Sequence, residues 1–175
     1  LFPDGGFFAL KTGSSAKDST FLVKFGPHKW HAHADLFHVE LSVKGIPLLV
    51  DSGTYRYNGV SVERQYFRGT SAHNTLSFKE ADQSLQLSTF RWMRPAKVES
   101  WDLREGEQEI FFTGIHNGYN RFGVLHRREI RVDRKIGSIN CRDYLEGKGQ
   151  GPVVVNWHFQ PGLEMRRQDS STFEV

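Results

Sequence analysis

The chain has 175 residues, which is enough for one domain with a buried core and short for two. Its formal net charge is only +3, and no long run of basic residues occurs, which excludes a basic nucleic-acid-binding tail. Aromatic residues make up 13%, and 17 glycines against 2 methionines favour sheets and turns over helices. Cys141 is the single cysteine, so no internal disulfide can form.

Segments with alternating apolar residues or β-rich composition recur along the whole chain, about eleven in number. In chain order they cover residues 6–11, 20–25, 36–43, 46–51, 73–78, 86–92, 95–101, 108–116, 122–132, 136–144 and 152–159. The crossover helices of a parallel sheet are missing, so we expect an all-β fold, an antiparallel multi-stranded β-sandwich with little or no helix. We expect a single domain over residues 1–175.

The longest interruption between strands covers residues 52–72 and is polar and rich in turn residues. A loop of this length inside a compact sandwich is more often functional than idle. The chain opens on Leu1 rather than Met and stops inside a strand-like stretch, so we expect it to be a piece of a longer protein.

Histidines and a carboxylate flank this loop in a pattern that suits a metal ion. His31 and His33 are two residues apart, so on an extended backbone both imidazoles point to the same side. A turn at Lys44-Gly45 would bring Asp51, at the end of an apolar strand, back beside His33, and His73 begins a later strand. Imidazole and carboxylate suit zinc. The alternative is a set of polar residues on a solvated sheet face.

Other polar residues have plainer interpretations. Asp35 is either a carboxylate that orients a metal-binding histidine or, as we favour, a surface carboxylate. His38, His116 and His126 share no spacing and are interpreted as structural. Arg127, Arg128 and Arg131 form a basic cluster, although Arg128 alternates away from the other two, and we interpret the cluster as a solvated strand face.

Several ordered motifs in the first hundred residues resemble the C-terminal domain of the heparinase II/III-like polysaccharide lyases. They are His31-Ala-His33-Ala-Asp35, Gly45-Ile-Pro47-Leu-Leu-Val-Asp51-Ser-Gly53-Thr-Tyr55-Arg-Tyr57, Arg64-Gln-Tyr66-Phe67-Arg68-Gly-Thr70-Ser-Ala72-His73-Asn74-Thr75 and Asp82-Gln83-Ser84, after an opening Phe2-Pro3-Asp4-Gly5-Gly6-Phe7. Residues 95–175 resemble the family only in being rich in strands.

The resemblance implies a site and a partner domain. Zinc, in a structural role, would be bound by His33, Asp51 and His73, while His31 would face the substrate carboxylate. On a regular extended strand both imidazoles would bind the metal, whereas the resemblance assigns only His33 to it. We follow the family and assume a twist or bulge in the backbone at the start of this strand. Such proteins carry an N-terminal helical toroid that supplies the principal catalytic base. They cleave uronate-containing polysaccharides, such as heparan sulfate or alginate, by β-elimination, and the toroid is absent from these residues.

The reaction explains why such residues are needed. Removing the C5 proton of a uronate requires groups that neutralise its carboxylate, then a base and an acid. We predict catalytic roles for His31, Tyr57 and Tyr66, the tyrosines in sugar stacking or proton transfer, and substrate binding by Arg64, Arg68 and Asn74. The alternatives are that the tyrosines are packing residues and the arginines only solvated.

The implied function is therefore the sandwich portion of a lyase for acidic polysaccharide, with no nucleic acid and no membrane span among its partners. We expect the parent protein to be periplasmic or secreted and the fragment alone to be inactive. A non-catalytic carbohydrate-binding or scaffold module is the alternative. A zinc hydrolase, with Asp35 or Glu63 as its base, is a third possibility.

Overall fold

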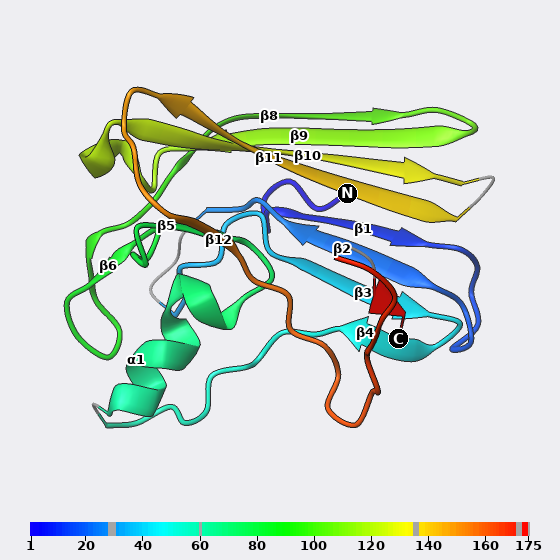
Figure 1. Ribbon diagram of the computed structural model, residues 1–175, viewed down its shortest axis with the longest axis horizontal. Coiled ribbons are helices and arrows are strands. Elements are labelled where there is room, and N and C mark those ends of the chain that lie inside the picture. The colour runs from blue at the N-terminus through cyan, green and yellow to red at the C-terminus, as the bar shows by residue number, and fades with distance from the viewer. Residues whose placement is uncertain (28–30, 60, 135–136, 171–172, 175) are drawn as a thin grey trace.

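The computed structural model describes residues 1–27, 31–59, 61–134, 137–170 and 173–174. Two four-stranded antiparallel sheets lie one above the other (Figure 1). The first contains, in spatial order, β1 (Phe7–Lys11), β2 (Thr20–Lys24), β3 (Val39–Val43) and β4 (Ile46–Leu49). The second contains β11 (Ser138–Gly147), β10 (Val124–Asp133), β9 (Glu109–His116) and β8 (Val98–Glu105). The predicted antiparallel β-sandwich is confirmed.

Several short elements lie outside the two four-stranded sheets (Figure 1). Three two-stranded pairs join β5 (Leu76–Phe78) to β12 (Val153–Val155), β6 (Leu85–Gln86) to β7 (Trp92–Arg94), and β13 (Arg166–Arg167) to β14 (Phe173–Glu174). The helical elements are α1 (Val62–Arg68) and the 3-10 turns η1 (Thr70–Ala72) and η2 (Asn120–Phe122). No helix in the described part of the chain is long and apolar enough to span a membrane.

The main core lies between the two sheets. Strand β9 alternates buried and partly buried residues along its length, which is the period-two pattern of a half-buried strand. Its inward side chains meet those of β1, β2 and β3, and the cluster consists of Phe8, Phe21, Val23, Phe25, Phe37, Val39, Ile110, Phe112, Ile130 and Val132. This rigid support carries the polar loops at the end of the sandwich.

The predicted hairpin between β3 and β4 is confirmed. Its turn residues Lys44 and Gly45 both have positive φ, 51° and 80°, as in a type I′ hairpin turn. The pairing places Val43 opposite Ile46 and Leu41 opposite Leu49. The chain therefore returns along β3 and delivers Asp51, just beyond β4, to the end of the sheet where β3 begins.

Strand β3 begins at Val39, so the prediction of a strand from residue 36 is wrong at its start. Phe37 has a positive φ of 61°, and the His38 amide donates to the Asp35 carbonyl at 3.0 Å. This turn ends the regular strand at Val39, although the Lys24 amide still donates to the His38 carbonyl at 3.0 Å and the Phe37 amide to the Lys24 carbonyl at 2.7 Å. The strands predicted at 73–78 and 152–159 are likewise shorter, at 76–78 and 153–155. Residue 136, the predicted start of another strand, lies outside the described residues.

Two further predictions differ from the structure. Residues 86–92 do not form one strand, because Leu87 and Ser88 donate their amides to the Arg91 carbonyl and turn the chain between β6 and β7. The segment 52–72, predicted as a loop, contains α1. Ser61 caps this helix by accepting from the Arg64 amide at 3.1 Å, and Glu63 lies in its first turn.

Candidate metal and substrate site

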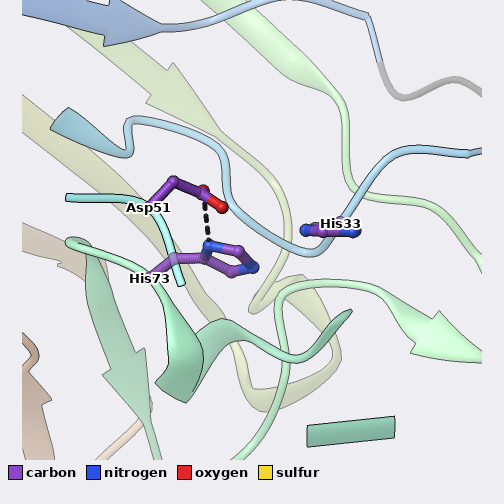
Figure 2. A group of neighbouring side chains, drawn as sticks. All are labelled: His33, Asp51 and His73. Atoms are coloured by element: carbon purple, nitrogen blue, oxygen red, sulfur yellow. Dashed lines mark hydrogen bonds and ion pairs between the residues drawn. The ribbon is translucent and has the colours of Figure 1, made fainter. Parts of the chain in front are cut away.

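Three side chains from distant parts of the chain converge beyond the ends of β3 and β4. His33 lies before β3, Asp51 follows β4, and His73 follows η1. Each offers one possible ligand atom, and these atoms all lie within 4.8 Å of one another (Figure 2). Two imidazoles and a carboxylate are a donor set that zinc accepts.

The segment that carries His33 is attached to the helical elements. The Ala34 amide donates to the Arg68 carbonyl at 2.9 Å, and the Thr70 hydroxyl donates to the Ala34 carbonyl at 2.7 Å. Next to it, Asp35 is buried and accepts from Lys24 Nζ at 2.6 Å through both oxygens. The interpretation of Asp35 as a surface carboxylate is therefore wrong, and its pairing with Lys24 fixes the turn after His33.

Asn74 joins the other two segments. Its side-chain amide donates to the carbonyls of Val39 at 2.8 Å and Val50 at 3.0 Å, and its Oδ1 accepts from the His158 amide. The residue is fully buried. Direct contact with a substrate, predicted from sequence, does not fit this arrangement, because the side chain already uses its donor and acceptor groups to hold Asp51 and His73 in place.

Hydrogen bonding fixes the orientation of His73. Its Nδ1 lies 3.0 Å from Asp51 Oδ2 (Figure 2). Because a carboxylate only accepts, Nδ1 carries the proton, and in the neutral ring the lone pair is on Nε2. That Nε2 is buried and has no hydrogen-bond partner in the described part of the chain. A buried nitrogen lone pair beside a second imidazole is what a bound zinc ion would satisfy.

The electrostatics favour the protonation states that a metal needs. Burial lowers the pKa of His33 to about 4, against a smaller opposing effect of Asp35. Burial alone would raise the pKa of Asp51, but the hydrogen bond and charge of His73 hold it well below its ordinary value. At neutral pH the site therefore presents a neutral imidazole and an ionised carboxylate, both competent ligands.

His38, which was predicted from the sequence to be only structural, also lies beside the candidate metal ligands. Its Nδ1 accepts the Asn74 amide at 2.9 Å, so a neutral ring carries its proton on Nε2. Nε2 lies 3.5 Å from Asp51 Oδ2, and the His38 side chain is buried. Its position could have indicated this, because His38 directly precedes β3 and the β3–β4 hairpin returns Asp51 to the same end of the sheet.

His31 does not join the three possible ligands. The backbone at His31 and His33 is a turn and coil rather than a strand, so the premise that both imidazoles point the same way is wrong. The His31 ring instead stacks on Tyr57, with centroids 5.5 Å apart, and meets the edge of Phe90 at 5.1 Å. Phe90 was missed from sequence because it lies in the hairpin predicted as a continuous strand.

The remaining predicted residues lie around α1. Tyr57 and Tyr66 are 53% and 48% exposed, so neither is a core packing residue. Arg64 and Arg68 lie on the covered side of α1 and are both buried, so the alternative that they are merely solvated is wrong. Arg64 lies 5.8 Å from the Tyr57 ring centre, which connects it to His31 through one aromatic side chain.

Comparisons with known proteins show the family and the fold of this chain. A heparin-sulfate lyase from Bacteroides stercoris is 27% identical over 177 residues, covering 98% of this chain and 24% of that protein. A solved heparinase III gene product matches with a TM-score of 0.76 at 25% identity, over 96% of this chain and 25% of its own. The fold of a heparan sulfate lyase from Pedobacter heparinus matches with a TM-score of 0.73 at 22% identity, over 90% of this chain and 23% of its own.

This chain thus spans about a quarter of the length of the relatives it matches. The family model for the heparinase II/III-like C-terminal domain matches residues 1–174. The match extends beyond the motifs of the first hundred residues to the whole second sheet. The chain therefore belongs to the heparinase II/III-like C-terminal domain family.

Proposed function

We propose that this chain is the β-sandwich part of a polysaccharide lyase that cleaves a uronate-containing, heparan sulfate-like polysaccharide by β-elimination. The observation that carries the proposal is the convergence of His33, Asp51 and His73 beside the exposed pair His31 and Tyr57. The names of the similar proteins favour the substrate class. A helical domain elsewhere in the complete gene product would supply the base.

The residues of this chain would act on the substrate carboxylate and the sugar face. His31, accessible at the end of the sandwich, can donate a hydrogen bond to the uronate carboxylate and so stabilise charge that develops when C5 loses its proton. Tyr57 would provide an aromatic platform that holds the His31 ring and a sugar face. Tyr66, exposed on α1, remains available for proton transfer to the leaving oxygen.

Zinc would be bound by His33, Asp51 and His73 in a structural role. A bound divalent ion would supply positive charge that ties the three segments together and keeps His31 in place. The test is metal content of the purified protein together with its melting temperature before and after chelation. We expect about one zinc per chain and a lower melting temperature without it; if chelation changes neither quantity, the metal proposal fails.

The lyase proposal is tested on the complete gene product with heparan sulfate, by following the ultraviolet absorbance of newly formed unsaturated uronate ends. His31→Ala should abolish this signal and leave the melting temperature unchanged. Arg104→Gln, which alters an exposed side chain on β8, is the control and should retain full activity. Wild-type protein that binds the polysaccharide without forming unsaturated ends would instead support a carbohydrate-binding module.

A further inference from the structure

A small cavity lies between α1 and the β6–β7 hairpin, apart from the three possible metal ligands. Its volume is about 160 Å³, and its walls are Gly59, Arg64, Gln65, Arg68, Gln86 and the hairpin residues 87–89. Leu87 and Ser88 on its outer wall are exposed. A ligand therefore meets this cavity from the surface of the hairpin without crossing the sandwich core.

Two positive charges in its walls lack a negative partner. Arg64 and Arg68 are only 2% and 1% exposed. Among the described residues, neither guanidinium has an Asp or Glu oxygen within 4.0 Å, although eight pairs between another Lys or Arg and a carboxylate meet that distance. Burying a cation without a counter-ion is strongly unfavourable.

The hydrogen bonds of the two side chains are also incomplete. Arg64 Nη1 donates to the hydroxyl and carbonyl of Thr54, and Arg68 Nη1 donates to the Ser88 carbonyl at 2.8 Å. Three buried donors, Arg64 Nε, Arg68 Nε and Arg68 Nη2, have no acceptor in the described part of the chain. Both side chains line the same cavity, so an oxyanion bound there could supply the missing acceptors.

Aromatic rings do not replace that acceptor. The Arg68 guanidinium lies 4.4 Å from the Trp92 ring centre, and Arg64 lies 5.8 Å from that of Tyr57. A ring face attracts a cation, but it leaves the in-plane N–H groups without an oxygen. Burial, and then the charge of Arg64, lower the pKa of Arg68 to about 10, so its guanidinium is still charged at neutral pH. Burial also lowers the pKa of Arg64, but a guanidinium in a protein keeps its proton.

We propose that Arg64 and Arg68 form an oxyanion-binding subsite that takes a sulfo or carboxyl group of an acidic saccharide. Tyr57 connects it to His31, since the same ring stacks on His31 and lies over Arg64. The subsite thus lies one aromatic side chain away from the group that would bind the uronate being cleaved. The assignment to a saccharide rests on the proposed function, whereas the binding of a simple oxyanion does not.

The test is a titration of the complete gene product with sodium sulfate at constant ionic strength, made up with sodium chloride. Melting temperature and calorimetry report binding. Arg64→Gln and Arg68→Lys are compared with Arg91→Gln, which removes an exposed guanidinium from the same hairpin. We expect saturable binding in the wild type and in Arg91→Gln, and a sulfate Kd at least tenfold weaker in the other two variants.

The absence of saturable sulfate binding to the wild type would overturn the proposal; this is the result if a carboxylate elsewhere in the gene product neutralises the pair. An equal loss in Arg91→Gln would overturn it too, because it would show non-specific attraction. If Arg68→Lys does not fold, Arg64→Gln decides. Sulfate binding without elimination activity would support the subsite and contradict the lyase proposal. Elimination activity without sulfate binding would support the lyase proposal and contradict the subsite.

The chemical source of the oxyanion is distinguished by competition against bound sulfate. Sulfated and chemically desulfated heparan sulfate oligosaccharides of equal length are compared, with sodium acetate as the simple carboxylate. Displacement by the sulfated oligosaccharide alone assigns the subsite to a sulfo group. Displacement by both oligosaccharides and by acetate assigns it to a carboxyl group, and displacement by neither excludes the saccharide.

Discussion

Arg128 lies directly opposite Asp143 in the pairing of β10 with β11 and donates to both carboxylate oxygens, at 2.7 and 2.8 Å. Its remaining nitrogen, Nη1, donates to the carbonyls of Phe37 and Asn74, each at 2.8 Å. A fully buried guanidinium in the second sheet thus holds the turn before β3 and the segment after His73. The pair connects the core of the sandwich to the candidate site.

Removing either member of this pair should destabilise the fold strongly. Arg128→Met leaves the mostly buried Asp143 carboxylate without its counter-ion, so we expect the free energy of unfolding to fall by about 3–5 kcal/mol. Urea denaturation measures the change. Arg131→Gln is the control, because its pair with Glu109 is exposed, and it should cost at most about 1 kcal/mol. Equal losses in the two variants would contradict this account.

Asp143 also terminates a chain of buried imidazoles. The Gly118 amide donates to His116 Nδ1 at 3.1 Å, so a neutral His116 carries its proton on Nε2 and donates to His126 Nδ1 at 2.8 Å. His126 Nε2 then donates to Asp143 at 2.7 Å. Each ring in this series has a defined proton position, which explains how two buried histidines are accommodated beside a buried arginine.

Sequence reasoning located the sandwich because period-two alternation and turn residues are local signals. Lys44-Gly45 is an example, since these residues favour a two-residue hairpin turn, although a bulge between Leu41 and Ser42 shifts the register farther along the hairpin. The helix α1 was missed because its seven residues are too few to show helical periodicity. The Ser61 cap, with Glu63 in the first turn, was the available signal for it.

Burial of charged residues was harder to predict, because it depends on partners that are distant in sequence. Arg128 was interpreted as solvated, yet in β10 it has the same parity as buried Ile130 and Val132. That parity already placed it on the core face, but only Asp143 on β11 makes such a position tolerable. The same reasoning applies to Asp35, which depends on Lys24 of β2.

His38 should tune the affinity of the metal site without being a ligand. Its Nε2 lies 3.5 Å from Asp51 Oδ2 and has no hydrogen-bond partner in the described part of the chain, so a small shift on metal binding would let it donate to that ligand. Removing a group that orients a metal ligand in this way commonly weakens metal binding by about 10–100-fold. We therefore expect His38→Gln to raise the zinc Kd by about that factor, as measured by competition with a chromogenic chelator. Glu40→Gln alters the half-exposed neighbour on the other side of His38 and should leave the Kd within about twofold. Equal zinc affinity in wild type and His38→Gln would show that His38 only fills space.

His33 should make the stability of the metal-free protein depend on pH. In the unfolded chain it takes up a proton near pH 6.5, whereas in the folded protein it does so only near pH 4. Between these values the unfolded state binds more protons, so the free energy of unfolding decreases as the pH falls from 6.5 to 4. The size is about 1–3 kcal/mol, the lower end allowing for solvent screening of this partly buried ring.

Urea denaturation in the presence of a chelator, at several pH values from 4 to 7, measures this effect. His33→Gln removes the titrating group, so its stability should decline less steeply over the same interval. Other groups, such as the buried His116 and His126, contribute equally to both proteins and cancel in the comparison. Parallel curves for the two proteins would mean that the His33 ring is not desolvated in solution.

Substitutions of Tyr57 can distinguish a stacking role from a role in proton transfer. The two rings stack at 5.5 Å with an interplanar angle of 30°, and Tyr57→Phe preserves this contact while removing the hydroxyl. If Tyr57 is a platform, Tyr57→Phe keeps kcat/KM within about threefold, whereas Tyr57→Ala lowers it at least tenfold by releasing the His31 ring. Loss of about 10²–10⁴-fold in Tyr57→Phe would instead make its hydroxyl the catalytic acid. The same substitution at Tyr66 serves as the comparison, because that hydroxyl is the one assigned to proton transfer.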